Sequence, residues 1–170
     1  FKVTKHNDLT YSFSKEFTVK NLDGSSSTFV LTKKYTFNEN DYLFKLDVTI
    51  DGNDQMEYLD FSNSAYTLRT SPQIGPYFDR KKDKYENRTF MAFAGNKAKR
   101  QVLGNNQMKT FDKKYLWTGV AGKYFTFLVV PESSGAMGDV VYSTQLDQNN
   151  YANAQVMLTR HPILKNNVTD

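Results

Sequence analysis

Hydrophobic and polar residues alternate most regularly between Tyr42 and Ile50. The apolar residues of this segment fall on one face of an extended chain: Tyr42, Phe44, Leu46, Val48 and Ile50. A period of two is typical of an antiparallel strand with one buried face and one solvated face. The preceding segment, 28–37, has a similar pattern, and the polar residues 38–41 connect the two. The pattern therefore predicts a β-hairpin.

The stretch Lys113–Pro131 holds the largest concentration of apolar and aromatic residues in the chain. Within it, residues 124–130 place apolar groups on both alternating faces. That pattern is typical of a strand that is covered on both sides. Pro131 cannot donate a ladder hydrogen bond, so it is expected at the end of the strand. We therefore predict that residues 124–130 form the central core strand.

Further strand-like segments recur about every 8–12 residues. They are 9–13, 17–19, 57–61, 65–68, 85–93, 140–146 and 155–158. The polar, glycine-interrupted stretch Gly95–Lys109 predicts a surface loop, and residues 161–170 show no period. No window has a convincing helical period. The sequence therefore predicts an all-β, antiparallel sandwich or barrel that forms a single domain over residues 1–170.

The composition narrows the class of protein further. The chain contains no cysteine, which excludes disulfides, thiol catalysis and the usual zinc sites, and which is compatible with the periplasm. No apolar run approaches the roughly 20 residues that a membrane-spanning helix needs, and no signal peptide is recognisable. Because the chain opens at Phe1 and not at a methionine, we expect it to be a piece of a longer protein.

Positive residues are clustered, and the formal net charge is +4. The clusters lie at 80–84, 97–100 and 113–114. The simplest interpretation is that they keep surface loops solvated. The alternative is contact with anionic lipid headgroups or with an acidic partner. The candidate contact residues are Arg80, Lys82, Lys99 and Arg100. Nucleic acid is not expected, since no recognition helix or aromatic-basic motif frames the clusters.

The sequence offers no constellation of residues for catalysis or cofactor binding. His6 and His161 lie near opposite ends of the chain without a clustered carboxylate or a spaced second ligand, so no metal site is predicted. The carboxylate pairs at 51/54 and 79/83 fall in predicted turns, where aspartate bonds to the backbone. Phosphate-binding glycine motifs and a nucleophile elbow are absent. We therefore predict no catalytic residue, no metal and no cofactor.

The surplus of aromatic residues leaves a second interpretation open. Exposed rings could line a sugar-binding groove by stacking. The chain would then be a carbohydrate-binding or mutarotase-like β-sandwich. Mutarotation would need a histidine and a carboxylate in one cleft. The chain has only two histidines, and this scarcity argues against the enzyme.

One motif resembles a known family. Trp117 is followed by a small or apolar step, the pair Tyr124-Phe125 and an apolar run that ends at Pro131. This order resembles the large periplasmic domain of the YidC family of bacterial membrane protein insertases. Residues 28–50, with an apolar strand, a polar turn and an alternating strand, are similar to the early part of that domain. The resemblance covers roughly Thr28–Pro131.

The resemblance implies a β-supersandwich of the galactose mutarotase-like type, without enzymatic activity. It implies a domain of the bacterial inner membrane insertase that faces the periplasm, truncated here before the membrane core. In the family this domain offers a surface to partners, including SecDF of the Sec translocon, and serves nascent membrane proteins. Four residues of this chain match the motif and take a structural role by this resemblance: Trp117, Tyr124, Phe125 and Pro131.

Overall fold

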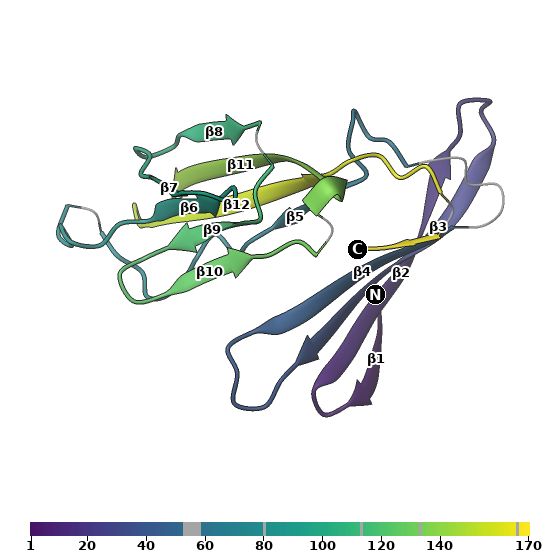
Figure 1. Cartoon of the computed structure of the whole chain (residues 1–170), viewed down its shortest axis with the longest axis horizontal. Helices are drawn as coiled ribbons and strands as arrows, with labels where there is room; N and C mark the ends of the chain where they lie inside the picture. The colour runs from purple at the N-terminus through teal and green to yellow at the C-terminus, as the bar shows by residue number, and fades with distance from the viewer. Residues whose placement is uncertain (53–58, 80, 113, 133, 166) are drawn as a thin grey trace. The chain divides into compact units, whose positions relative to one another are not determined.

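The computed structural model describes residues 1–52, 59–79, 81–112, 114–132, 134–165 and 167–170. The chain divides into two compact units. Unit 1 comprises residues 1–62 and 162–170, and unit 2 comprises residues 63–161. Apart from one short 3-10 helix, η1 (Ser134–Ala136), the regular elements of the described residues are β-strands (Figure 1).

Unit 1 is built on one antiparallel sheet of five strands in the order β1-β2-β3-β4-β13. The strands are β1 (Lys2–Asn7), β2 (Thr10–Lys20), β3 (Ser26–Phe37), β4 (Phe44–Gly52) and β13 (Asn167–Thr169). Leu31 lies opposite Ile50 and Tyr35 lies opposite Leu46, so the apolar residues of β3 and β4 share one face. The predicted hairpin is confirmed.

The two chain segments of unit 1 meet at Leu59 and Ile163. These residues exchange backbone hydrogen bonds of 2.8 and 3.0 Å, and both side chains are buried. Of the predicted strand 57–61, residues 57 and 58 lie outside the described residues, and Leu59 forms this isolated bridge. The C-terminal segment, whose sequence shows no period, is thus held in unit 1 at Ile163 and through β13.

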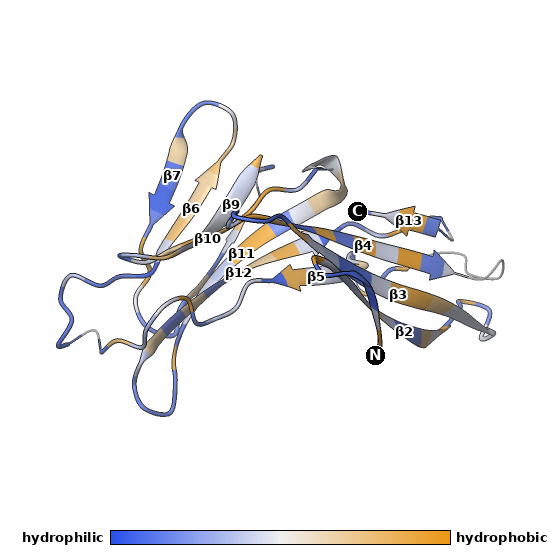
Figure 2. Cartoon of the chain, turned by 90° about the horizontal axis from the view of Figure 1, so that it is seen from below, coloured by the Kyte–Doolittle hydropathy of each residue, from blue (hydrophilic) through white to orange (hydrophobic). Residues whose placement is uncertain are grey.

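Unit 2 contains two antiparallel sheets of four strands, in the orders β10-β9-β6-β7 and β5-β12-β11-β8. The first sheet consists of β6 (Thr89–Phe93), β7 (Ala98–Gln101), β9 (Trp117–Ala121) and β10 (Thr126–Val129). The second consists of β5 (Tyr66–Arg69), β8 (Met108–Phe111), β11 (Met137–Leu146) and β12 (Ala152–Arg160). Figure 2 shows that β7 is mostly hydrophilic, whereas β11 and β12 carry apolar residues.

The core of unit 2 draws on both of its sheets. Phe90 and Val120 from the first sheet and Tyr142 and Val156 from the second are fully buried in one cluster. The ring of Phe90 stacks on that of Phe111, with ring centres 4.4 Å apart. Aromatic rings of this size dominate the apolar area that a core removes from water. The predicted all-β antiparallel sandwich is confirmed.

Two finer predictions about the fold remain predictions. The galactose mutarotase-like β-supersandwich is one of them, and a single domain spanning residues 1–170 is the other. The loop predicted at Gly95–Lys109 is wrong in part, because it contains β7 and the start of β8. Both are edge strands of their sheets, and an edge strand can remain polar because only one side of it is paired.

The prediction of a central strand at 124–130 is wrong. Only Thr126–Val129 form a strand, β10, and it lies at the edge of its sheet, paired with β9. Two of its residues pack against the core, while Leu128 on the other face is 46% exposed. Leu128 lies over Gly119, its opposite residue, which has no side chain to compete for that space. A strand with apolar residues on both faces therefore need not lie in the centre of its sheet. Here β9 has a central position, next to β10.

Candidate interaction surface

A buried arginine forms the base of a surface site in unit 2. Arg88, directly before β6, is 6% exposed, and its guanidinium forms an ion pair with the carboxylate of Glu86. Its Nη2 atom donates hydrogen bonds to the carbonyl oxygens of Ile74, at 2.6 Å, and Pro76, at 3.3 Å. Burial lowers the pKa of Arg88, and the negative charge of Glu86 opposes that shift. Arg88 thus ties the 74–76 loop to the start of a core strand.

Two aromatic side chains hold the same arginine in place. The ring of Phe78 lies against the guanidinium, with Cζ of Arg88 4.5 Å from the ring centre. The hydroxyl of Tyr142, from the second sheet, donates a 2.9 Å hydrogen bond to the carbonyl oxygen of Arg88. Contacts of a guanidinium with a ring face are favourable in partly desolvated places. The base of the site is therefore fixed by both sheets of unit 2.

The turn between β9 and β10 closes against this base. The amide of Lys123 donates a 2.9 Å hydrogen bond to Oε1 of Glu86. A Cβ atom at Gly122 would lie 2.6 Å from Nη1 of Arg88, so only glycine allows this approach. The ring of Phe125 lies so close to Gly75 that a side chain at Gly75 would overlap it. The turn and the 74–76 loop are thus in direct contact.

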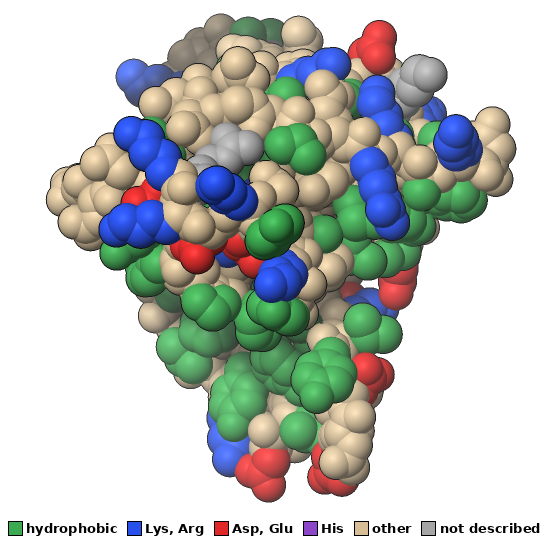
Figure 3. Space-filling view, turned by 90° about the vertical axis from the view of Figure 1, so that its left-hand side faces the viewer, with side chains coloured by type: hydrophobic (Ala, Val, Ile, Leu, Met, Phe, Trp, Pro, Cys, Tyr) green, Lys and Arg blue, Asp and Glu red, His purple; other side chains and the backbone are tan. Residues whose placement is uncertain are grey.

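Aromatic and cationic side chains surround a hollow of about 380 Å³ above this base. We call this the aromatic–lysine site and define it by Tyr77, Lys82, Lys84, Tyr85, Lys123, Tyr124 and Phe125. The tyrosine rings at 77, 85 and 124 are 63%, 87% and 75% exposed. The end view of the molecule shows lysine and arginine side chains interspersed with hydrophobic ones on this unit (Figure 3).

Two of the ionisable groups in the site have identifiable partners. Nζ of Lys123 lies 4.8 Å from the ring centre of Tyr124. A hydrogen bond to the side chain of Tyr124 raises the pKa of Lys123, and the charges of Glu86 and Asp83 act in the same direction. Lys82 lies 3.8 Å from a carboxylate oxygen of Asp79. The lysines of the site are exposed at the surface.

The aspartates beside these lysines shape the loop. The backbone amide of Lys81 donates to Asp79, at 2.8 Å, and the amide of Asp79 donates to the carboxylate of Asp83, at 3.0 Å. Backbone bonds from the amides of Lys82 and Asp83 to the carbonyl of Asp79 complete the turn. The expected turn-forming role of this carboxylate pair is confirmed.

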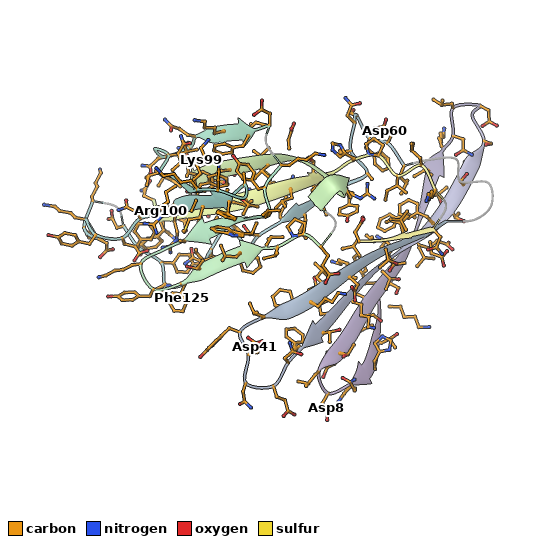
Figure 4. All side chains as sticks on the ribbon, in the orientation of Figure 1. Asp8, Asp41, Asp60, Lys99, Arg100 and Phe125 are labelled. Carbon is orange, nitrogen blue, oxygen red and sulfur yellow. The ribbon has the colours of Figure 1, made fainter. Side chains whose placement is uncertain are left out.

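The structure brings some of the sequence-predicted residues together and separates others. Lys82, Tyr124 and Phe125 meet in the aromatic–lysine site. Lys99 and Arg100 lie apart from it on β7, as the labelled side chains show (Figure 4). Arg80 lies outside the described residues. Tyr124 and Phe125 are surface residues here, although the family motif implies a packing role for them.

The remaining motif residues lie within or after strands of the first sheet. The ring of Trp117, on β9, stacks on that of Phe93, on β6, with centres 6.0 Å apart. The two residues are direct partners in the strand register. Pro131 follows the end of β10, where its missing amide removes no ladder bond.

Lys99 has a contact that sequence reasoning missed. Its Nζ lies 4.5 Å from the ring centre of Phe111, and Nζ of Lys109 lies 5.5 Å from the same ring. Lys99 is opposite the buried Ala92 and Lys109 is opposite the buried Tyr142, so both side chains start on the core-facing side of their strands. The stems of two lysines therefore cover one edge of the core.

The histidines do not form a site with other ligands. Nε2 of His6 lies 2.9 Å from Oγ of Ser12, and the amide of His161 donates to the carbonyl of Ala136. Among the residues that the structure describes, no three histidine, aspartate or glutamate side chains are grouped closely enough to bind a metal ion. The described residues also contain no helix long and apolar enough to cross a membrane.

Sequence reasoning missed Glu86 and Arg88, the residues at the base of the site. The sequence does carry one signal for these two residues. They have opposite charges and lie two positions apart, directly before an apolar strand. Alternate residues lie on one face of an extended chain, so their side chains can form an ion pair. The partners at Ile74 and Pro76 carry no local signal, since they bond through backbone atoms.

Comparisons with known proteins identify relatives of the chain. The chain is homologous to membrane protein insertases. It is 39% identical over 160 residues to the membrane protein insertase YidC of Treponema denticola, a match that covers 93% of this chain and 27% of the relative. It is 31% identical over 160 residues to YidC of Treponema pallidum, covering 77% of this chain and 26% of the relative. The resemblance to YidC is confirmed.

The chain spans about a quarter of the length of these relatives. No protein-family model matches the chain, and no solved structure matches it. Both relatives are named as insertases, so the comparisons do not favour the carbohydrate-binding alternative.

Proposed function

We propose that this chain is the periplasmic domain of a YidC-type insertase of the bacterial inner membrane and acts there as a non-catalytic interaction module. The observation that carries the proposal is homology to YidC over 93% of the chain. The domain serves the insertion and folding of membrane proteins by binding partners. Insertion itself is the task of the membrane core of the insertase, which lies outside this chain.

The ionisable groups of the aromatic–lysine site support a binding role. The charge of Glu86 is compensated by Arg88, and the carboxylates of Asp79 and Asp83 accept backbone hydrogen bonds in a turn. A general acid or base needs a proton that it can exchange with a substrate near neutral pH. An arginine is charged throughout that range. These groups are therefore engaged in an ion pair and in structural hydrogen bonds.

Two features give such a module means of binding. β1 and β10 are the last strands of their sheets, so one edge of each can pair with an extended peptide. The aromatic–lysine site adds exposed rings and cations, which suit an anionic or amphipathic partner. The partners that we propose are SecDF of the Sec translocon and nascent membrane proteins.

The orientation of the domain can be tested in the full insertase. Because this chain contains no cysteine, a Glu39→Cys variant in a cysteine-free insertase introduces one reporter in the exposed turn between β3 and β4. We expect this cysteine to react with a membrane-impermeant maleimide in intact spheroplasts. Reaction only after the inner membrane has been lysed would contradict a periplasmic domain.

The partner contact can be tested with two variants of equal charge. Arg80→Glu/Lys82→Glu reverses charge in the basic segment 80–84, which includes Lys82 of the aromatic–lysine site, and Lys99→Glu/Arg100→Glu does so on β7. We expect at least one of these charge reversals to reduce co-purification of SecDF with the full insertase. If neither variant changes co-purification, the basic loops take no part in partner binding.

A further inference from the structure

We propose that the aromatic–lysine site docks on the surface of an anionic bilayer. Its lysines would pair with lipid phosphate groups, and its exposed rings would lie at the level of the headgroups. The inference rests on the proposed function, because a domain of an inner-membrane insertase is tethered beside a bilayer. It deepens that function by naming the occupant of one surface.

The exposed rings supply the first argument. Tyr85 and Tyr124 are 87% and 75% exposed, and the purely apolar Phe125 is 53% exposed. Rings with an apolar body and a polar tip are favoured where hydrocarbon meets water, and tyrosine is enriched at that depth of membrane proteins. These rings come from two separate segments but line the same hollow.

The charges supply the second argument. Lys82 has a side chain that is 84% exposed, and Lys84 and Lys123 line the same hollow. The neighbouring acids are engaged within the protein: Asp79 and Asp83 accept backbone hydrogen bonds, Asp79 also lies 3.8 Å from Nζ of Lys82, and Glu86 is paired with Arg88. The site therefore presents three exposed lysines, of which Lys82 is partly compensated by Asp79. A bilayer with anionic lipids attracts such a face within a Debye length of about 8 Å.

The rigid base supplies the third argument. The turn that bears Lys123 and Tyr124 is bonded to Glu86, and the ring of Phe125 is seated on Gly75. The turn that carries Lys123, Tyr124 and Phe125 is thus positioned before any ligand is present, which reduces the entropy lost on docking. Unconnected lysines on mobile loops would offer charge without this fixed arrangement.

The basic residues on β7 serve as a contrast. Lys99 lies over the ring of Phe111, where its stem covers the core. Arg100 is exposed, but no aromatic residue of the site lies in its segment. Charge alone therefore does not distinguish the two places, whereas the combination of rings and lysines does.

The test uses the purified chain, residues 1–170, with vesicles. Its affinity is measured by co-sedimentation with phosphatidylcholine alone and with mixtures in which about one third of the lipid is phosphatidylglycerol. The site variant is Lys82→Glu/Lys84→Glu/Lys123→Glu. The matched control, Lys97→Glu/Arg100→Glu/Lys114→Glu, makes the same change in net charge at exposed residues elsewhere in unit 2. A third variant, Tyr85→Ser/Tyr124→Ser, removes two rings and no charge. Circular dichroism verifies that all variants are folded.

We expect binding to the anionic vesicles only, weakened by salt. A loss of roughly fivefold per lysine gives about a hundredfold loss for the site variant, and the control should retain most of the affinity. The tyrosine variant should also bind more weakly. Equal losses in the site variant and the control would overturn the proposal, because net charge alone would then explain binding. Binding to a polyglutamate peptide without binding to vesicles would overturn it too, and would assign the site to an acidic protein.

These results are separable from the test of orientation. Vesicle binding together with a cytoplasmic result for Glu39→Cys would leave the docking surface standing and overturn the proposed function. A periplasmic result for Glu39→Cys without vesicle binding would leave the proposed function standing and overturn the docking surface.

Discussion

Arg88 and Glu86 form an ion pair in which the two side chains are only 5% and 16% exposed. The hydrogen bonds from Arg88 to Ile74 and from Lys123 to Glu86 extend the pair to the two segments that flank it. Removing two charges from water is unfavourable unless their mutual attraction and further hydrogen bonds compensate. The pair therefore defines the shape of the aromatic–lysine site more than it stabilises the fold.

Removing one partner of this pair should be strongly destabilising. In Glu86→Ala the guanidinium of Arg88 stays buried without its counter-charge, so we expect a loss of about 3–5 kcal/mol in the free energy of unfolding. Urea denaturation of the purified chain measures this change. The double variant Glu86→Ala/Arg88→Met should be more stable than Glu86→Ala alone, because it leaves no isolated charge. If Arg88→Met adds its own full penalty to that of Glu86→Ala, the two residues are not coupled.

A methyl group at Gly119 should disrupt the pairing of β9 with β10. Its Cβ would overlap the carbonyl oxygen of Phe127 and would lie 2.7 Å from Cδ2 of Leu128. The backbone carbonyl cannot move aside as a flexible side chain can, so Gly119→Ala should cost about 1–3 kcal/mol or more in stability. Gly135→Ala is the control, because nothing lies within 4 Å of its added Cβ. Thermal unfolding of both variants checks the difference, and equal melting temperatures would contradict this packing.

Local patterns in the sequence predict the strands and several members of the site, but not their neighbours. The hairpin of β3 and β4 is predictable because its alternation, its turn and its partner strand are adjacent in the chain. Lys82, Tyr124 and Phe125 could be singled out because they belong to a basic cluster and a family motif. Their meeting in one hollow could not be predicted, since about 40 residues, which include the strands β6 to β9, lie between Lys82 and Tyr124.

The incorrect predictions share one physical cause. Whether a strand is central or at the edge of a sheet depends on which strands pair with it. The periodicity of the sequence shows only which faces of a strand are apolar. β10 has apolar residues on both faces, yet Leu128 covers the backbone of Gly119 at the sheet edge. β7 has the composition of a loop because its lysine and arginine suit an edge strand.

Tyr115 should make the stability of the chain sensitive to alkaline pH. It is 7% exposed and its hydroxyl has no hydrogen-bond partner among the described residues. Burial, with a smaller contribution from Asp112, raises the pKa of Tyr115 above its ordinary value. The neutral form is therefore favoured in the fold. Its contribution to stability is complete below the unfolded pKa of about 10 and is lost as the pH rises through the folded pKa.

The variant Tyr115→Phe tests this origin. It removes both the titrating group and a buried hydroxyl without a partner, so at neutral pH it should be as stable as the parent or more stable by about 1 kcal/mol. Above pH 10 its stability should fall less steeply than that of the parent. Denaturant titrations at several pH values measure both effects. Parallel pH profiles for the two proteins would show that other groups cause the alkaline loss.

Lys99 should protect the edge of the core in unit 2. Its side chain lies on the core-facing side of β7, over the ring of Phe111, so it covers apolar surface and places a charge beside an open sheet edge. Inward-pointing charges on edge strands oppose pairing with another chain. For Lys99→Leu we expect little change in the free energy of unfolding, because the apolar cover of Phe111 is retained, but increased self-association. Light scattering at rising protein concentration measures the association.

The adjacent residue offers a control for this role. Arg100 is opposite Met91 and therefore starts on the other face of β7, away from Phe111. Arg100→Leu removes the same charge and adds the same side chain, so net charge and total hydrophobicity match those of Lys99→Leu. If Lys99→Leu associates more than Arg100→Leu, the inward position of the charge is what protects the chain against self-association. Equal association of the two variants would show that any charge on β7 suffices, and the contact with Phe111 would then matter only for packing.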